Sequence, residues 1–198
     1  MIQVLELECP GCGRPLSTDM KECPACHRPV IISSVSNVAA MSSLEINKYV
    51  NTYNKALAAN PADSKTNGAL AICLLKLKLY DKAASAFDKA LVDDLDNSEM
   101  FFWAAVCVLK GRKAFLCQRT EIEKAEEYIH AAIMIEPRGI YYYFWAYIRQ
   151  DFYARKFLRV QPDFHVLLSE AVGHNVTETE INQLFDTLNV SQPSALTV

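Results

Sequence analysis

Four cysteines near the start of the chain have the residue type and the spacing of a metal site. Cys9 and Cys12 form one Cys-x-x-Cys pair, Cys23 and Cys26 form a second, and ten residues separate the pairs. Each pair offers two thiolates from one tight turn, and the four sulfur atoms together supply a tetrahedral set of ligands for one zinc ion. The sequence therefore predicts one structural Zn²⁺ bound by these four residues.

Other chemistry would use the same cysteines. Two disulfides, a redox-active Cys-x-x-Cys or a catalytic zinc are the alternatives. A complete shell of four thiolates leaves no position for water, which disfavours catalysis. Gly13 follows the first pair and His27 the second, where a positive φ lets backbone amides point at sulfur. His27 is one residue past Cys26, and we interpret it as a bystander rather than a fifth ligand.

The residues around the cysteines form a longer pattern of prolines, a glycine, a leucine and an aspartate. Its members are Cys9, Pro10, Cys12, Gly13, Leu16, Asp19, Cys23, Pro24 and Cys26. The pattern resembles the short zinc-ribbon domains at the ends of many bacterial and archaeal proteins, which implies a small β fold over residues 1–31. Such ribbons contact proteins, contact nucleic acids or only stabilise, so the resemblance does not choose a function. A slightly basic surface is formed by Arg14, Lys21 and Arg28. These residues either contact a nucleic acid or are simply solvated charges.

Helical periodicity fills most of the remaining chain. Residues 32–43 are rich in serine and read as a linker, although their apolar members would also fit against a helical surface. The clearest helix covers residues 80–91, where small and large apolar residues share one face and charged residues the other. The apolar face consists of Ala83, Phe87, Ala90 and Leu91, and it returns at Ala125, Ile129, Ala132 and Ile133 and, in part, at Tyr49, Tyr53, Ala56 and Leu57.

These faces resemble the second helix of tetratricopeptide repeats, which carries Ala-x-x-x-Phe-x-x-Ala and ends at a proline. Ala83, Phe87 and Ala90 match the motif, and Ala56 and Ala90 are 34 residues apart, as in that family. The next interval, from Ala90 to Ala132, is 42 residues, which places an insertion at residues 111–123. The tryptophan, glycine and tyrosine of the family's first helix are mostly missing. The expected fold class is mostly α: a tetratricopeptide-like antiparallel helical repeat, or α-solenoid, with a small N-terminal β zinc ribbon; an irregular helical bundle is the alternative.

The repeat domain is expected over residues 44–190. Thr177 and Glu180 fit a capping box for a last helix that closes the stack, and residues 191–198 are expected to be a flexible tail.

In this architecture the first helix of each repeat lines a concave surface. That surface would receive Phe102, Val106, Tyr141, Phe144 and Ile148, an aromatic and apolar groove for a protein or peptide partner. The run from Tyr141 to Tyr147 is also aromatic nearly all round, which is typical of a buried helix. Core packing, under the C-terminal helices or a second copy of the chain, is therefore the competing interpretation for each ring.

A basic cluster follows the aromatic run. It consists of Arg149, Arg155, Lys156 and Arg159, and it offers a contact for a phosphate or an acidic partner, or only a solvated face. The chain as a whole is not basic, with 20 Lys and Arg against 23 Asp and Glu, which disfavours a general nucleic-acid binder.

The composition favours a folded cytoplasmic protein without a membrane partner. Hydrophobic residues make up 51% of the chain, and no apolar run approaches a bilayer-spanning length. We find no phosphate-binding glycine loop and no nucleophile elbow, and we predict no catalytic residues. Three functions follow: a protein-binding adaptor first, then a nucleic-acid-associated regulator that uses the ribbon and the basic cluster, and a homo-oligomeric structural protein.

Overall fold

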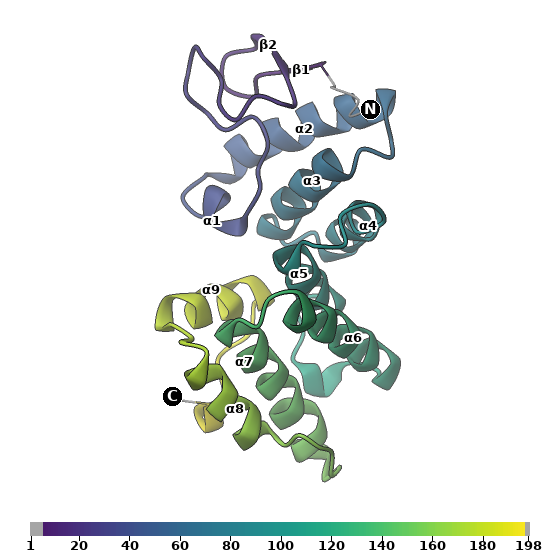
Figure 1. Ribbon diagram of the computed structural model, residues 1–198, viewed down its shortest axis with the longest axis vertical. Helices are drawn as coiled ribbons and strands as arrows, with labels where there is room; N and C mark the ends of the chain where they lie inside the picture. Colours follow the sequence, from purple (N-terminus) through teal and green to yellow (C-terminus); the bar gives the residue numbers. More distant parts are fainter. Residues whose placement is uncertain (1–5, 197–198) are drawn as a thin grey trace. The chain divides into compact units, whose positions relative to one another are not determined.

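The computed structural model describes residues 6–196 (Figure 1). This part of the chain contains nine α-helices and one two-stranded sheet. It divides into two compact units, Met1–Leu95 and Asp96–Val198, which are described separately below. The boundary falls inside the segment 44–190 that the sequence assigns to a single repeat domain.

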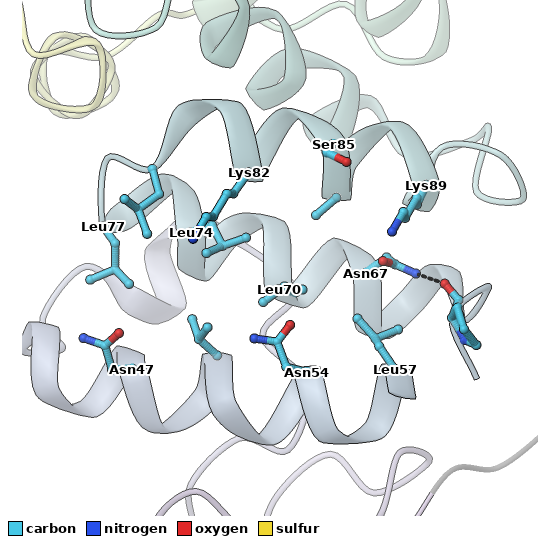
Figure 2. A pocket seen from close by; sticks show the side chains of 14 residues that line it. Asn47, Asn54, Leu57, Asn67, Leu70, Leu74, Leu77, Lys82, Ser85 and Lys89 are labelled. Carbon is cyan, nitrogen blue, oxygen red and sulfur yellow. Dashed lines mark hydrogen bonds between the residues drawn. The ribbon is translucent and has the colours of Figure 1, made fainter. Parts of the chain in front are cut away.

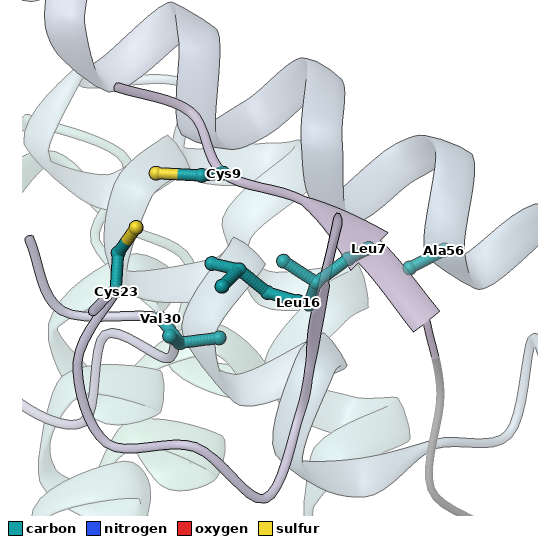
Figure 3. Close-up of a cluster of buried hydrophobic side chains, with 6 residues drawn as sticks. All are labelled: Leu7, Cys9, Leu16, Cys23, Val30 and Ala56. Atoms are coloured by element: carbon teal, nitrogen blue, oxygen red, sulfur yellow. The ribbon is translucent and has the colours of Figure 1, made fainter. Parts of the chain in front are cut away.

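The first unit begins with a small ribbon. Strand β1 (Glu6–Glu8) pairs antiparallel with β2 (Pro15–Ser17), and Leu7 lies opposite Leu16. Both leucines are buried. They belong to a cluster of six buried residues, shown in Figure 3: Leu7, Cys9, Leu16, Cys23 and Val30 of the ribbon and Ala56 of the helix Ser43–Ala59. A core this small holds little folding free energy of its own.

The segment expected as a linker is packed. Residues Val35–Val38 form the short helix α1, and both of these valines are buried, as is Ile32. Of the two interpretations of residues 32–43, a linker and a segment that rests on a helical surface, the structure agrees with the second, because the apolar side chains among the serines are buried.

Helices α2 (Ser43–Ala59), α3 (Ser64–Lys76) and α4 (Tyr80–Ala90) complete the first unit, and α3 packs against both of the others. Ser42 and Glu45 form a capping box at the start of α2, and Pro61 follows its end. Asp63 caps α3 by accepting a hydrogen bond from the Thr66 amide. Every residue of α3 from 66 to 75 is buried, so this helix is the centre of the unit.

Two tyrosines of α2 hold the end of the ribbon. The Tyr49 hydroxyl donates to the Pro29 carbonyl oxygen at 3.0 Å. The Tyr53 hydroxyl donates to the Val30 carbonyl at 3.0 Å and accepts from the Ile32 amide at 3.0 Å. Both rings are fully buried, and burial raises the pKa of Tyr49 to about 12 and that of Tyr53 well above its usual value. The ribbon is therefore docked on α2.

Substitution of Tyr53 by phenylalanine tests this docking. Tyr53→Phe should lower the free energy of unfolding of the first unit by about 1–3 kcal/mol, because it leaves one buried amide and one buried carbonyl without a partner. Thermal unfolding followed by far-ultraviolet circular dichroism measures the change. Tyr142→Phe, at a partly exposed ring of the second unit, is the matched control. Equal effects of the two substitutions would contradict the proposed role of the Tyr53 hydroxyl.

The second unit opens with a pair of helices, α5 (Ser98–Val108) and α6 (Arg119–Ile135), which pack against each other. The insertion expected at residues 111–123 contains a single 3₁₀ turn at Ala114–Leu116 and then the first residues of α6. The Tyr147 hydroxyl accepts from the Ala114 amide, and Asp151 accepts from the Phe115 amide. The insertion is therefore an ordered connection that lengthens α6.

Helix α7 (Gly139–Ile148) continues into one π-helical turn at Arg149–Tyr153. It packs against α8 (Phe164–Gly173) and α9 (Glu178–Leu188). Gly139 is required at the start of α7, because a Cβ there would lie 2.6 Å from the Ala171 carbonyl oxygen. The predicted capping box of Thr177 and Glu180 begins α9 and is confirmed.

The end of the chain is ordered up to Leu196. The buried Tyr143 hydroxyl donates to the Leu196 carbonyl at 2.6 Å and accepts from Gln192 at 2.8 Å. Leu196 itself is fully buried. The expectation of a flexible tail over residues 191–198 is thus corrected for residues 191–196, while the last two residues lie outside the described part.

Most residues of the repeated faces occupy the core, while Leu57 and Ile133 are partly exposed. Ala83, Phe87, Ala90, Ala125, Ile129 and Ala132 are at most 1% exposed. Within each unit, consecutive helices pair: α3 with α4, α5 with α6, and α7 with α8. The helical fold class and the N-terminal sheet are confirmed at this level.

Candidate functional site

The four ribbon cysteines lie together. Their Sγ atoms are all within 4.8 Å of one another, with Cys9 and Cys26 3.4 Å apart and Cys12 and Cys23 3.6 Å apart. A tetrahedral ion with metal–sulfur bonds of about 2.3 Å needs sulfur atoms about 3.8 Å apart. The observed spacing fits one such ion, so the cluster is a candidate metal centre.

The two Cys-x-x-Cys turns have the same backbone. The Cys9 carbonyl accepts from the Gly13 amide and the Cys23 carbonyl accepts from the His27 amide, both at 2.9 Å. Gly13 has φ of +74° and His27 +56°, which confirms the expected left-handed position after each pair. The His27 side chain is exposed and is not part of the cysteine cluster, as predicted.

The surroundings of the cluster favour the ionisation of one cysteine, Cys23, to a thiolate. Burial raises the pKa of Cys23, but hydrogen bonds from the amides of Ala25 and Cys26 and from the neighbouring thiols outweigh this effect. The net result is a pKa lowered to about 6. Hydrogen bonding to the Arg28 amide lowers the pKa of Cys26. Burial and the three other sulfur atoms disfavour another negative charge more strongly, so the pKa of Cys26 is raised to about 12. A bound cation removes that repulsion among four thiolates.

The residues expected to line an aromatic groove are in the core. Phe102 is 2% exposed, and Val106, Tyr141, Phe144 and Ile148 are 0% exposed. The Phe102 ring centroid lies 4.8 Å from that of Tyr141 and 5.8 Å from that of Phe144. The structure brings these rings together as packing partners, which leaves a partner no access to them. The competing interpretation, core packing, describes them correctly.

The aromatic helix is covered by its own chain. Helices α8 and α9 pack on α7, and the Phe185 ring lies 5.4 Å from that of Tyr147. A second copy of the chain is therefore not needed to bury this helix.

The expected basic cluster is dispersed. Arg149 is buried, while Arg155 pairs with Asp151 at 2.6 Å and lies over the Phe115 ring. Lys156 lies 3.7 Å from the centroid of the Phe152 ring, and Arg159 is exposed. In the ribbon, Arg28 pairs with Glu45 at 3.0 Å. The four residues therefore do not form one cationic stripe.

Arg149 belongs instead to a buried polar cluster that sequence reasoning missed. Its Nε lies 3.3 Å from Oε1 of Glu126, and its guanidinium lies over the rings of Trp145 and Tyr153. Glu126 also accepts hydrogen bonds from Trp145 Nε1 at 3.1 Å and from the Tyr153 hydroxyl at 2.9 Å. Glu126 lies on the apolar face of α6. A carboxylate on such a face indicates a buried polar partner, and this was the signal available in the sequence.

The first unit carries a second feature that sequence reasoning missed: a groove of about 510 Å³ along α3, between α2 and α4 (Figure 2). We call it the leucine groove. Its floor contains Leu70 and Leu74 of α3 and Leu77 directly after it. Its walls contain Asn47, Val50, Asn54 and Leu57 of α2 and Lys82, Ser85, Ala86 and Lys89 of α4. The remaining lining residues are Pro61, Asn67 and Leu79.

The leucine groove is not the binding surface that the sequence predicts. None of the five residues predicted to line the binding surface, from Phe102 to Ile148, is among the lining residues of the groove. The available signal was the polar spacing on the walls, because Asn47 and Asn54, like Lys82 and Lys89, are seven residues apart and share one helix face.

The other cysteines do not extend the metal centre. Burial raises the pKa of Cys73 to about 12, as expected for a thiol inside an apolar helix, and it also raises the pKa of Cys117. A raised pKa keeps a thiol protonated and unreactive at neutral pH.

Comparison with known families and with curated proteins finds no match for this chain. Among residues 6–196, none of the helices combines the length and the apolar character that crossing a bilayer requires.

Proposed function

We propose that this protein is a non-enzymatic adaptor, in which a tetratricopeptide-like helical scaffold binds a segment of a protein partner and a zinc ribbon stabilises the scaffold. The observation that carries the proposal is the leucine groove. Its floor is apolar and its rim is polar, which is the arrangement of surfaces that bind peptides through a few apolar anchors.

The exposed fractions along the groove support binding. Leu77, Val50 and Leu57 are partly exposed, and Leu79 is 43% exposed. These side chains line a single hollow rather than lying scattered over the surface. An apolar hollow rimmed by polar groups gains free energy when a complementary apolar face covers it.

The ribbon supports the scaffold through one structural Zn²⁺. Four thiolates complete a tetrahedral shell, and four cysteines without histidine or carboxylate favour zinc over harder cations such as Mg²⁺. With the ion bound, the Cys-x-x-Cys turns and the residues after them are held where Tyr49 and Tyr53 meet them.

A selection of peptides tests the proposed function. Phage-displayed random peptides of about 16 residues, long enough to form a helix on binding, are selected on the full chain, and the recovered peptides are synthesised. Fluorescence anisotropy then measures their affinity. The double substitution Val50→Gln and Leu77→Gln should weaken binding at least about tenfold, because two apolar contacts are lost.

The chain offers a matched control for this test. Val92→Gln with Leu95→Gln makes the same chemical change at residues that are 70% and 62% exposed and lie outside the groove. This variant should bind the peptides as the unchanged protein does. If no peptide is selected, or if the selected peptides bind both variants equally well, the leucine groove is not the binding site.

A further inference from the structure

The charged residues that line the leucine groove are all positive. Among the 14 lining residues are two lysines, three asparagines and a serine, and none is acidic. Lys82 and Lys89 are exposed, and neither forms an ion pair with another of the described residues. An occupant therefore meets two lysines, both on the α4 wall, and no carboxylate among the lining residues.

The two walls differ in chemistry but share a spacing. Lys82 and Lys89 are two helical turns apart on α4, about 10 Å along the axis. Asn47 and Asn54 have the same spacing on α2, and Figure 2 shows their side chains rising from α2 toward the α4 wall. One flank of the groove is thus cationic, and the other offers neutral amide donors and acceptors.

The floor between these walls has the spacing of a helix-packing surface. Leu70 and Leu74 of α3 and Leu77, the residue that caps its end, follow an i, i+4, i+7 pattern. Ridges of this kind accept the apolar stripe of another helix. An apolar floor has no backbone partners for an extended chain, whereas a helix satisfies its own backbone hydrogen bonds.

We propose that the leucine groove binds an amphipathic helix of a partner protein that carries acidic residues two turns apart beside its apolar stripe. The apolar stripe covers the partly exposed Val50, Leu57 and Leu77, above Leu70 and Leu74, which are 7% and 6% exposed and add little surface. The two carboxylates pair with Lys82 and Lys89. The opposite flank of the helix lies against Asn47 and Asn54. This inference rests on the proposed function and names the chemistry of its partner.

Three synthetic helices of about 16 residues test the inference with one variable. They share leucines in an i, i+4, i+7 pattern, and they carry two glutamates, two glutamines or two lysines at the flanking positions two turns apart. Anisotropy at low salt should give the order glutamate, glutamine, lysine, with about three- to tenfold between the first and the second. The difference should shrink as salt screens the charges.

Charge reversal supplies the decisive comparison. Lys82→Glu with Lys89→Glu should invert the order, so that the lysine peptide binds best. Lys48→Glu with Lys65→Glu changes the net charge equally at exposed residues outside the groove and should preserve the original order. A glutamate peptide in which a central residue is proline should not bind, because the break disrupts the helix.

Four results would overturn the inference while leaving the proposed function intact. Equal affinity for the three helices, or the same order after reversal of Lys82 and Lys89, would show that the lysines do not select the partner. Tight binding of the proline-containing peptide would show that the occupant is extended. Absence of binding by all three helices also overturns the inference, while the peptide selection above judges the groove itself.

Discussion

Removal of the metal is expected to unfold the ribbon and to destabilise the first unit. Binding of structural zinc contributes on the order of 10 kcal/mol in comparable small domains. The six-residue cluster beside the cysteines is too small to replace that contribution. A strong chelator should therefore lower the midpoint temperature at which the first unit unfolds, as followed by circular dichroism. Addition of Zn²⁺ should restore that temperature. Elemental analysis should find about one zinc per chain before chelation.

A cysteine substitution makes the same test without a chelator. Cys23 is fully buried at the centre of the cluster, and Cys23→Ser should abolish stoichiometric zinc binding. Cys73→Ala, which removes a buried thiol of α3, is the matched control and should retain one zinc per chain even if it lowers stability. Full zinc content in Cys23→Ser, or a transition that the chelator leaves unchanged, would refute the assignment of the four cysteines.

Loss of the Glu126 carboxylate should strongly destabilise the second unit. The side chains of Glu126 and Arg149 are 11% and 9% exposed. Removal of either one therefore leaves the charge of the other buried and unpaired. Glu126→Ala should cost roughly 3–5 kcal/mol, as is typical when one member of a buried ion pair is removed. Both tryptophans of the chain, Trp103 and Trp145, belong to this unit, so their fluorescence during urea unfolding reports it directly.

Two further variants separate charge from truncation. Glu127→Ala changes the exposed neighbour on α6 and should shift stability by less than about 0.5 kcal/mol. Glu126→Gln with Arg149→Met removes both charges and keeps an oxygen acceptor, so it should be more stable than Glu126→Ala. If Glu126→Ala unfolds at the same urea concentration as Glu127→Ala, the ion pair contributes nothing measurable.

The sequence predicts the features that depend on local chemistry. The cysteine cluster follows from the spacing of two short turns, and the start of the last helix follows from the capping box of Thr177 and Glu180. The buried positions of Ala83 and Phe87 follow from a face with clear amphipathic contrast. In each case the determining residues lie within a few positions of one another.

Features that join distant parts of the chain are not predicted. Helix α7 is apolar nearly all round, so periodicity does not say which rings are accessible, and the expected groove around Tyr141 proves to be core. The leucine groove takes residues from three helices, and the Glu126 cluster joins α6 to Trp145 and Tyr153. The linker and the tail are ordered by contacts with Tyr53 and Tyr143, which composition alone does not reveal.

Helix α2 serves two surfaces at once. One face holds the ribbon through Tyr49 and Tyr53, and the other supplies Val50 and Asn54 to a wall of the leucine groove. A rigid helix cannot move one face without the other. If loss of the ion lets α2 shift, an occupant of the groove and the ion become linked ligands, and each raises the affinity for the other by the same factor. Metal supply would then set how much of the protein is competent to hold its partner.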